Sequence, residues 1–263
     1  MIKINDKQVD LKHFPDGTLL LKELAPETEP VVLSWFFENN EELVALYFLT
    51  KHLQAKGITN IELKLPYIPN ARQDRVKAPE DVFTLKYFAQ MINELHFSKV
   101  TVLDPHSYVS EALIDHIDIQ SPKKYVEKVL AQIGTDNVML FFPDEGAMKR
   151  YSSMFELPYA FGMKKRDWTT GQILGLEAAG QTEVIKGSTI LIVDDICSKG
   201  GTFYYSAKAL KELGAEKVYL YISHCENSIL EGELIKSDLV EKVFTTNSIF
   251  TKEHEKVEVF DYE

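Results

Sequence analysis

Cysteine and long apolar runs are scarce in this sequence. Cys197 and Cys225 are the only cysteines among 263 residues, which excludes a disulfide framework and favours a reducing compartment. No apolar run approaches the roughly 18–20 residues that span a membrane, and the first ten residues lack the apolar core of a signal peptide. We therefore expect a cytoplasmic protein with no membrane partner.

Positive charge is also in short supply. The sequence has 29 basic and 40 acidic residues, a formal net charge of −11, which disfavours binding along a nucleic-acid backbone. We expect no nucleic-acid partner, although a local basic site for a small phosphorylated ligand stays open. With 45% hydrophobic and 26% charged residues, the composition is typical of a globular protein with a substantial core.

Apolar runs alternate with segments of helical periodicity. The pattern predicts strands at 31–36, 61–68, 99–104, 137–144, 188–195 and 216–224, and helices at 41–57, 79–95 and 203–214. Continuous apolar strands that alternate with helices indicate parallel sheets covered on both faces. We expect an α/β protein of two domains, residues 1–118 and 119–263, each with a mostly parallel sheet flanked by helices.

The stretch "TILIVDDICSKGGT" (residues 189–202) ends a predicted strand on two acids and continues into a glycine-containing loop and a helix near Thr202. Ligands of parallel sheets gather at the carboxyl ends of strands, and free N–H groups at a helix N-terminus bind phosphate. The acids suit sugar hydroxyls or hydrated Mg²⁺. The stretch predicts a ribose 5-phosphate pocket of Asp194, Asp195, Ser198, Lys199, Gly200, Gly201 and Thr202. An ordinary strand end followed by a turn is the alternative.

A second polar cluster follows the predicted strand at 61–68. In "LPYIPNARQDRV" (residues 65–76), Arg72 and Arg75 are able to grip a polyphosphate with paired N–H donors. Gln73 and Asp74 either read an adenine edge or order the arginines. The alternative is a surface loop with local ion pairs, which usually contribute little to stability.

These two motifs resemble those of a known family. "VDDICSKGGT" resembles the phosphoribosyl-diphosphate (PRPP) binding motif that type I phosphoribosyltransferases share with ribose-phosphate pyrophosphokinases. "ARQDR" resembles the nucleotide loop of the pyrophosphokinases, which phosphoribosyltransferases lack, and therefore favours the pyrophosphokinases. The resemblance runs from about Phe14 to about Ile249 and implies two type I phosphoribosyltransferase-like domains.

Further segments follow the order of that family. "FPDGT" (14–18) resembles a segment that reaches the ATP site of a neighbouring subunit, with Phe14 stacking on adenine and Asp16 accepting from its amino group. "VLDPHS" and "FFPDEGAMKR" resemble segments that imply metal-binding roles for His106 and Asp144. "MKKRD" (163–167) resembles the catalytic loop and implies Lys164 and Arg166 as catalytic residues. The implied ATP-binding residues are Phe14, Asp16, Arg72, Gln73, Asp74, Arg75 and His106.

The resemblance implies Mg²⁺-dependent transfer of diphosphate from ATP to ribose 5-phosphate by a homo-oligomer, a dimer or a hexamer. The sequence departs from the family in being short, in Thr18 replacing a glutamate, and in Ser198 and Lys199 replacing Asp-Thr. Lys199 adds positive charge that suits a diphosphate and raises an alternative acceptor, ADP-ribose, on which some phage-encoded relatives are understood to act, with a role in NAD metabolism. A PRPP-consuming phosphoribosyltransferase and a non-catalytic regulator are further alternatives.

Overall fold

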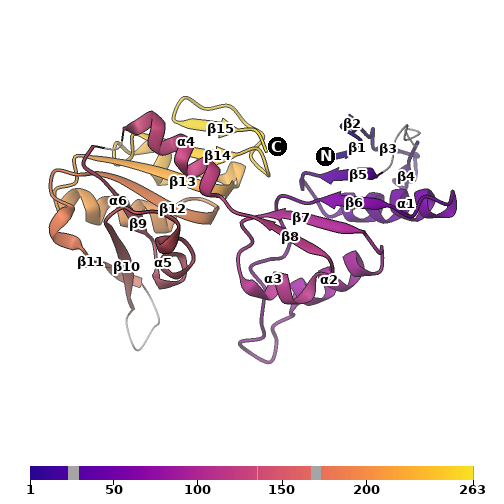
Figure 1. Cartoon of the computed structure of the whole chain (residues 1–263), viewed down its shortest axis with the longest axis horizontal. Coiled ribbons are helices and arrows are strands. Elements are labelled where there is room, and N and C mark those ends of the chain that lie inside the picture. Colours follow the sequence, from indigo (N-terminus) through magenta and orange to yellow (C-terminus); the bar gives the residue numbers. More distant parts are fainter. Residues whose placement is uncertain (23–29, 135, 167–172, 263) are drawn as a thin grey trace. The chain divides into compact units, whose positions relative to one another are not determined.

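The chain divides into two compact units, Met1–Ser121 and Pro122–Glu263 (Figure 1). The structure is a computed structural model, and it describes residues 1–22, 30–134, 136–166 and 173–262. The predicted boundary between residues 118 and 119 falls inside strand β8 (Ile117–Gln120). Because β8 pairs with β7 (Lys99–Leu103), it belongs to unit 1, and the division comes just after it.

Unit 1 contains a six-stranded sheet in the order β2-β1-β5-β6-β7-β8. Strands β5 (Val31–Trp35), β6 (Ile61–Lys64), β7 and β8 run parallel, whereas β1 (Ile2–Ile4) is antiparallel to both β5 and β2 (Lys7–Gln8). A separate short hairpin joins β3 (Lys12–His13) to β4 (Leu19–Leu20). The helices are α1 (Glu41–Ala55), α2 (Thr84–Asn93) and α3 (Tyr108–Leu113).

Two of these helices illustrate what local sequence determines. Helix α1 lies within the predicted range and buries Ala45, Leu46, Leu49 and Leu53, which recur at helical spacing. Helix α2 begins at Thr84, so the predicted start at Pro79 is wrong. The carboxylate of Asp81 accepts hydrogen bonds from the N–H groups of residues 77 and 78, at 2.8 and 2.9 Å, and this turn occupies the segment before the helix.

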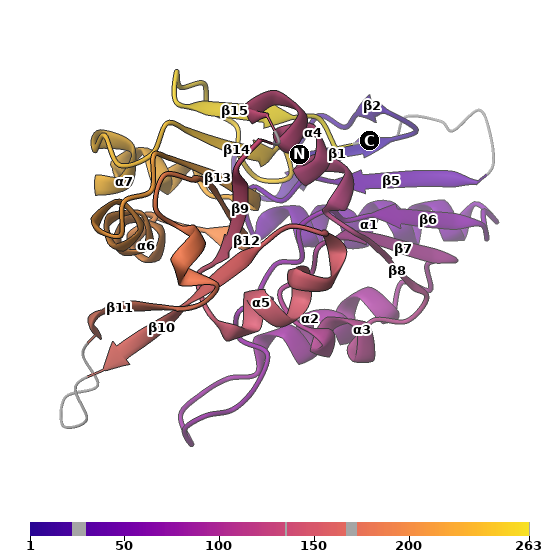
Figure 2. The same ribbon diagram turned by 60° about the vertical axis from the view of Figure 1, so that its left-hand side comes forward.

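Unit 2 contains a seven-stranded sheet in the order β11-β10-β9-β12-β13-β14-β15 (Figure 2). Its strands are β9 (Val138–Phe142), β10 (Tyr159–Arg166), β11 (Ile173–Gly180), β12 (Thr189–Cys197), β13 (Lys217–Cys225), β14 (Lys242–Thr246) and β15 (Val257–Phe260). All neighbouring pairs are parallel except β10 and β11. The predicted mostly parallel α/β architecture is confirmed.

Strand β12 is buried on both faces. Ile190 and Ile192 pack in one core with Phe203 and Ala207 of α6 (Gly201–Glu212), while Val193 is buried on the opposite face. This double burial explains why the strand reads as a continuous apolar run. Unit 2 is completed by α4 (Lys123–Ile133), α5 (Glu145–Tyr151) and α7 (Glu233–Lys236). None of the helices formed by the described residues has the length and apolar character needed to span a membrane.

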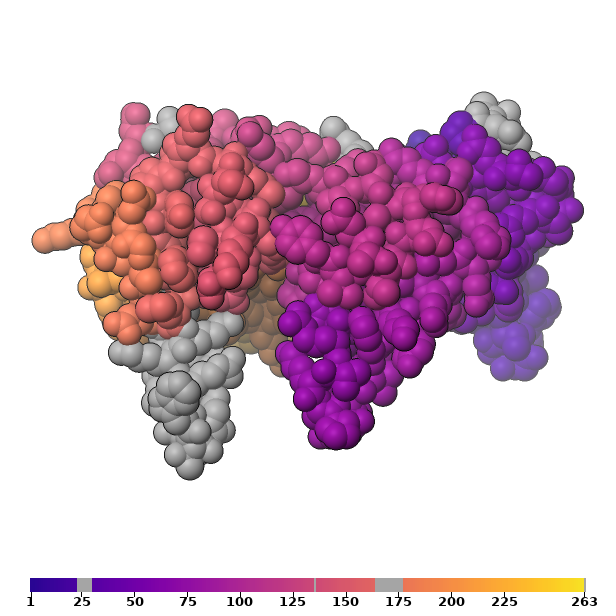
Figure 3. All heavy atoms as spheres, turned by 60° about the horizontal axis from the view of Figure 1, so that its bottom comes forward, coloured from indigo at the N-terminus to yellow at the C-terminus, as the bar shows by residue number. Residues whose placement is uncertain are grey.

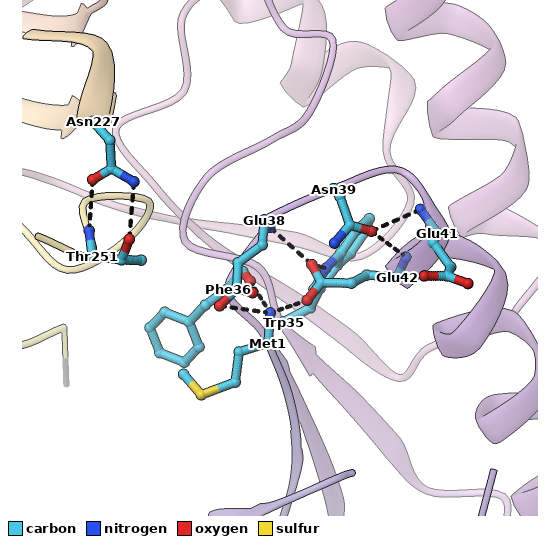
Figure 4. A network of polar contacts seen from close by, with 9 residues as sticks. All are labelled: Met1, Trp35, Phe36, Glu38, Asn39, Glu41, Glu42, Asn227 and Thr251. Atoms are coloured by element: carbon cyan, nitrogen blue, oxygen red, sulfur yellow. Dashed lines mark hydrogen bonds and ion pairs between the residues drawn. The ribbon is translucent and has the colours of Figure 1, made fainter. Parts of the chain in front are cut away.

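A buried carboxylate ties the start of unit 1 to α1 (Figure 4). Glu42 is 2% exposed, and its carboxylate accepts from Trp35 Nε1 at 2.9 Å and from the Glu38 N–H at 2.8 Å. The amino group of Met1 also binds this carboxylate and donates to the Phe36 carbonyl at 2.6 Å. The buried charge is therefore surrounded by donors, as burial of a carboxylate requires.

We predict that Glu42→Gln lowers the free energy of unfolding of unit 1 by about 1–3 kcal/mol, because an amide cannot accept from all of these donors. Denaturant unfolding followed by Trp35 fluorescence in a Trp168→Phe background would measure the loss. Glu41→Gln, at a half-exposed side chain paired with His13, is the control and should change stability by less than about 0.5 kcal/mol. Equal midpoints for both variants would contradict the role of Glu42.

Candidate functional site

The two acids at the end of β12 share one guanidinium. Arg150 Nη2, from α5, lies 2.5 Å from Asp195 Oδ1 and 3.2 Å from Asp194 Oδ1. The N–H of Asp195 donates to Asp194 Oδ1 at 3.0 Å. All three side chains are largely buried, so the pair of negative charges is held together by one buried positive charge.

Burial raises the pKa of Asp194 well above its ordinary value, and the neighbouring charge of Asp195 raises it further, while Arg150 opposes the shift. Sequence reasoning missed Arg150, although it lies in the quoted segment "FFPDEGAMKR". The available signal was indirect, because two adjacent acids at the end of a buried strand require a cation nearby. Since α5 follows β9, and β9 pairs with β12, this helix was the nearest source of that cation.

The predicted phosphate loop, residues 198–202, leads into α6 and packs closely against residues 226–232. Gly200 has a φ of +78° and precedes the first residue of α6, Gly201, so free N–H groups point out of the helix start. A Cβ on Gly232 would lie 1.9 Å from the Lys199 carbonyl oxygen. The backbones of 198–202 and 226–232 therefore approach more closely than side chains would permit. The Lys199 ammonium group is exposed and lies 3.3 Å from Glu231 Oε2.

Asp144 lies at the carboxyl end of β9, the strand next to β12. It is the N-cap of α5, and its Oδ1 accepts from the Ala147 N–H at 3.1 Å. The backbones of Lys164 and Arg166 lie in β10 and pair with Leu176 and Ile173 of β11, so this part of the predicted catalytic loop is strand. Asp167 lies outside the described residues.

In the "ARQDR" segment of unit 1, the buried side chain of Asp74 holds the side chain of Arg75 in place. Asp74 is 5% exposed, and its two oxygens accept from Nε and Nη2 of Arg75 at 2.7 and 2.9 Å. Gln73 Oε1 accepts from the Thr84 hydroxyl at 2.8 Å, and Arg72 is exposed. Of the two predicted roles of Asp74, ordering an arginine is the one that the geometry shows.

The same acid brings two sequence motifs together. The bond from Arg75 holds the pKa of Asp74 below its ordinary value, and Ser107 and the charge of His106 act in the same direction, against the effect of burial. His106 and Ser107 follow β7, the strand next to β6. The segment between β6 and α2 extends away from the sheet in Figure 1 and projects from unit 1 in Figure 3, in purple.

Phe14 and Asp16 occupy the turn between β3 and β4. Phe14 is 49% exposed, and the Phe14 N–H donates to the Thr18 carbonyl at 2.9 Å. Asp16 Oδ1 accepts from the N–H of Thr18 at 3.0 Å and from its hydroxyl at 2.7 Å, which lowers the pKa of Asp16. Thr18, which replaces the family's glutamate, thus orients the predicted adenine-binding acid. Phe14 also lines an apolar groove with Leu19, Leu21 and Phe48.

The predicted site residues fall into two groups. Those assigned to ATP lie in unit 1, and those assigned to ribose phosphate, together with Asp144, Lys164 and Arg166, lie in unit 2. Their convergence on one cleft stays a prediction. Among the described residues, no three or more His, Cys, Asp or Glu side chains form a cluster able to hold a metal ion. A site with fewer protein ligands still fits Mg²⁺, because this ion often binds through one or two carboxylates together with water and substrate phosphates.

The acid pair also generates a stability prediction. Above the ordinary pKa of an aspartate, about 3.9, the native state retains a proton on Asp194 that the unfolded chain has released, so stability falls as pH rises toward the raised native pKa. We predict that Asp194→Asn raises the thermal midpoint of unit 2 at pH 7 but not at pH 3.5, in metal-free buffer. Asp238→Asn, at a fully exposed carboxylate, is the control. An equal effect of Asp194→Asn at both pH values would contradict the assigned cause.

Known proteins with similar sequences span most of this chain. A ribose-phosphate pyrophosphokinase of Thermococcus kodakarensis is 29% identical over 250 residues, which cover 93% of this chain and 86% of the relative. The enzyme of that name from Bacillus subtilis is 26% identical over 229 residues, covering 84% and 70%. The predicted resemblance to ribose-phosphate pyrophosphokinases, a class of transferases, is confirmed.

The fold has a solved counterpart. Phosphoribosylpyrophosphate synthetase from Mycobacterium smegmatis superposes with a TM-score of 0.78 at 19% identity, covering 97% of this chain and 86% of that structure. The phosphoribosyl transferase domain, as a family, matches residues 123–259. Because this match spans more than half of the 263 residues, the chain belongs to the phosphoribosyl transferase domain family.

Proposed function

We propose that the protein transfers the diphosphate group of ATP to the anomeric hydroxyl of ribose 5-phosphate, giving PRPP and AMP. The observation that carries the proposal is the end of β12, where an acid pair meets the glycine-rich start of α6. A helix start suits the 5-phosphate, and carboxylates suit sugar hydroxyls. The similarity to ribose-phosphate pyrophosphokinases over both units supports the same reaction.

Within this proposal the acid pair orients the acceptor sugar. The carboxyl oxygens of Asp194 and Asp195 can accept from the hydroxyl groups of the sugar. Arg150 holds both acids in place. The anomeric oxygen would then attack the β-phosphorus of ATP in line, with AMP leaving, and positioning would supply much of the rate enhancement.

The basic groups bind the nucleotide and stabilise developing charge. Arg72 and Arg75 would hold the polyphosphate, with Arg75 oriented by Asp74, and Phe14 and Asp16 would bind adenine. Mg²⁺, held by Asp144 and His106 with the substrate phosphates, would neutralise phosphate charge. Lys164 and Arg166 would stabilise the charge that grows on the transferred group and on the AMP oxygen.

The proposal includes a cytoplasmic homo-oligomer. Phe14 and Asp16 lie on a hairpin that is separate from the six-stranded sheet, and the Phe14 ring is half-exposed. An exposed aromatic ring beside an acid fixed by Thr18 suits binding to adenine in a neighbouring subunit. A dimer or a hexamer would complete each ATP site in this way.

A second acceptor is favoured by one observation. Lys199 places an exposed ammonium group beside the phosphate loop, where it pairs only loosely with the exposed Glu231. An ammonium in this position suits a second phosphate beyond the one bound by α6. ADP-ribose carries that phosphate, and the same diphosphate transfer onto ADP-ribose would belong to NAD metabolism.

The products of the reaction test the proposal directly. Incubation with Mg²⁺-ATP and either ribose 5-phosphate or ADP-ribose, followed by mass analysis, should give AMP together with the diphosphorylated acceptor. Omission of Mg²⁺ should abolish both products. Formation of AMP with only one acceptor would identify the substrate, whereas no AMP with either would exclude diphosphate transfer and favour a phosphoribosyltransferase or a regulator.

We also predict that Lys164→Ala lowers turnover by on the order of a hundredfold or more, because loss of one transition-state donor costs roughly 2.7–4 kcal/mol. Steady-state AMP release and the thermal midpoint would be measured together, to separate catalysis from folding. Lys165→Ala removes the same charge one residue away and serves as the matched control. Near-normal turnover of Lys164→Ala would remove this lysine from the mechanism.

A further inference from the structure

An acid that the sequence analysis did not assign is bonded to the phosphate loop. Glu226 follows β13 directly, and its Oε1 accepts from the Ser198 hydroxyl at 2.8 Å. Its Oε2 accepts from the Ser228 hydroxyl at 3.1 Å, and its backbone N–H donates to the Cys197 carbonyl at 2.8 Å. Glu226 therefore joins the loop that follows β12 to the turn that follows β13.

The direction of the bond between Ser198 and Glu226 decides what Ser198 can offer a ligand. A serine hydroxyl has one proton and two lone pairs, and a carboxylate is only an acceptor. The proton of Ser198 is committed to Glu226, in a charge-assisted bond that is stronger than a neutral one. Toward a ligand Ser198 therefore acts as an acceptor and not as a donor to phosphate.

The position of Glu226 is fixed by the turn that carries it. Its carbonyl accepts from the Ile229 N–H at 3.1 Å, within the short 3-10 helix Asn227–Glu231. Asn227 exchanges two hydrogen bonds with Thr251, at 2.9 and 3.0 Å (Figure 4). The same turn leads to Gly232, whose backbone packs against Lys199. The carboxylate is therefore held beside the loop by backbone contacts on several sides.

We propose that Glu226 is a specificity-determining residue that fixes Ser198 as a hydrogen-bond acceptor for a hydroxyl group of a phosphorylated sugar. The phosphate itself is then bound by the N–H groups at the start of α6 and by Thr202. Free phosphate brings no sugar hydroxyl from which Ser198 could accept, so this hydrogen bond favours the sugar phosphate. The inference rests on the proposed function only in that the loop binds a sugar phosphate.

This role accounts for one departure from the family pattern. In the resemblance described above, Ser198 stands where the family motif has an aspartate. Glu226 brings a carboxylate back to the same place from the neighbouring strand, 2.8 Å from the serine oxygen. The acid thus acts through Ser198 and is a positioning residue for the sugar.

The test compares two ligands by calorimetry, without ATP or metal: inorganic phosphate and ribose 5-phosphate. Ser198→Ala should weaken ribose 5-phosphate binding about fivefold and leave phosphate binding unchanged. Glu226→Gln provides an amide N–H that can donate to Ser198 Oγ and let the serine proton turn toward phosphate, so it should strengthen phosphate binding about tenfold, equivalent to 1.4 kcal/mol. Adding Ser198→Ala to Glu226→Gln should remove most of that gain. Glu233→Gln removes the same charge from an exposed side chain nearby and should change neither affinity.

Several results would overturn the inference. Weaker phosphate binding by Ser198→Ala alone would show that the serine donates to phosphate after all. If the double variant kept the stronger phosphate binding of Glu226→Gln, the effect of Glu226 would come from its charge alone and not from its bond to Ser198. Failure of the proposed function is seen separately, because a protein that binds ribose 5-phosphate with this selectivity but releases no AMP retains the role of Glu226 and loses the reaction.

Discussion

The adjacent carboxylates at the end of β12 are the constraint on which the rest of unit 2 depends. Parallel strands covered on both faces place the end of β12 in a poorly hydrated environment, where two like charges are costly. The positive charge of Arg150 offsets the repulsion between the two carboxylates. Arg150 reaches them because α5 starts immediately after β9, the strand that pairs with β12. The sheet order and the site chemistry are therefore linked through one guanidinium.

The proposed phosphate loop, residues 198–202, shows a similar dependence on close backbone approach. Gly200 adopts a left-handed conformation at the start of α6, and Gly232 lies against the Lys199 carbonyl where a side chain would clash. This contact brings the turn after β13 beside the loop after β12. The carboxylate of Glu226, which lies in that turn, is thereby placed within hydrogen-bonding distance of Ser198. A chain without glycine at position 232 would separate the two segments and lose the bond from Ser198 to Glu226.

The sequence predicted what depends on local periodicity and on motifs. The apolar strands, α1 and the acid pair at a strand end could be read directly, because burial on both faces leaves continuous apolar runs. The start of α2 could not be predicted in this way. The Asp81 carboxylate accepts a hydrogen bond from the Lys77 N–H, four residues earlier, and this turn occupies the segment before the helix. Arg150 and Glu226 were missed because their partners lie 44 and 28 residues away, and only the sheet order brings them together.

These contacts give the acids of a chain with net charge −11 a common role. The net charge of such a chain opposes polyphosphate binding, so the proposed function depends on donor groups that are held in fixed positions within each unit. Asp74 orders Arg75, the 194–195 pair holds Arg150, and Glu226 sets the direction of the Ser198 hydroxyl. In each case a largely buried or fixed carboxylate determines the geometry of a neighbouring group, so the acidic composition is compatible with the proposed binding of phosphate.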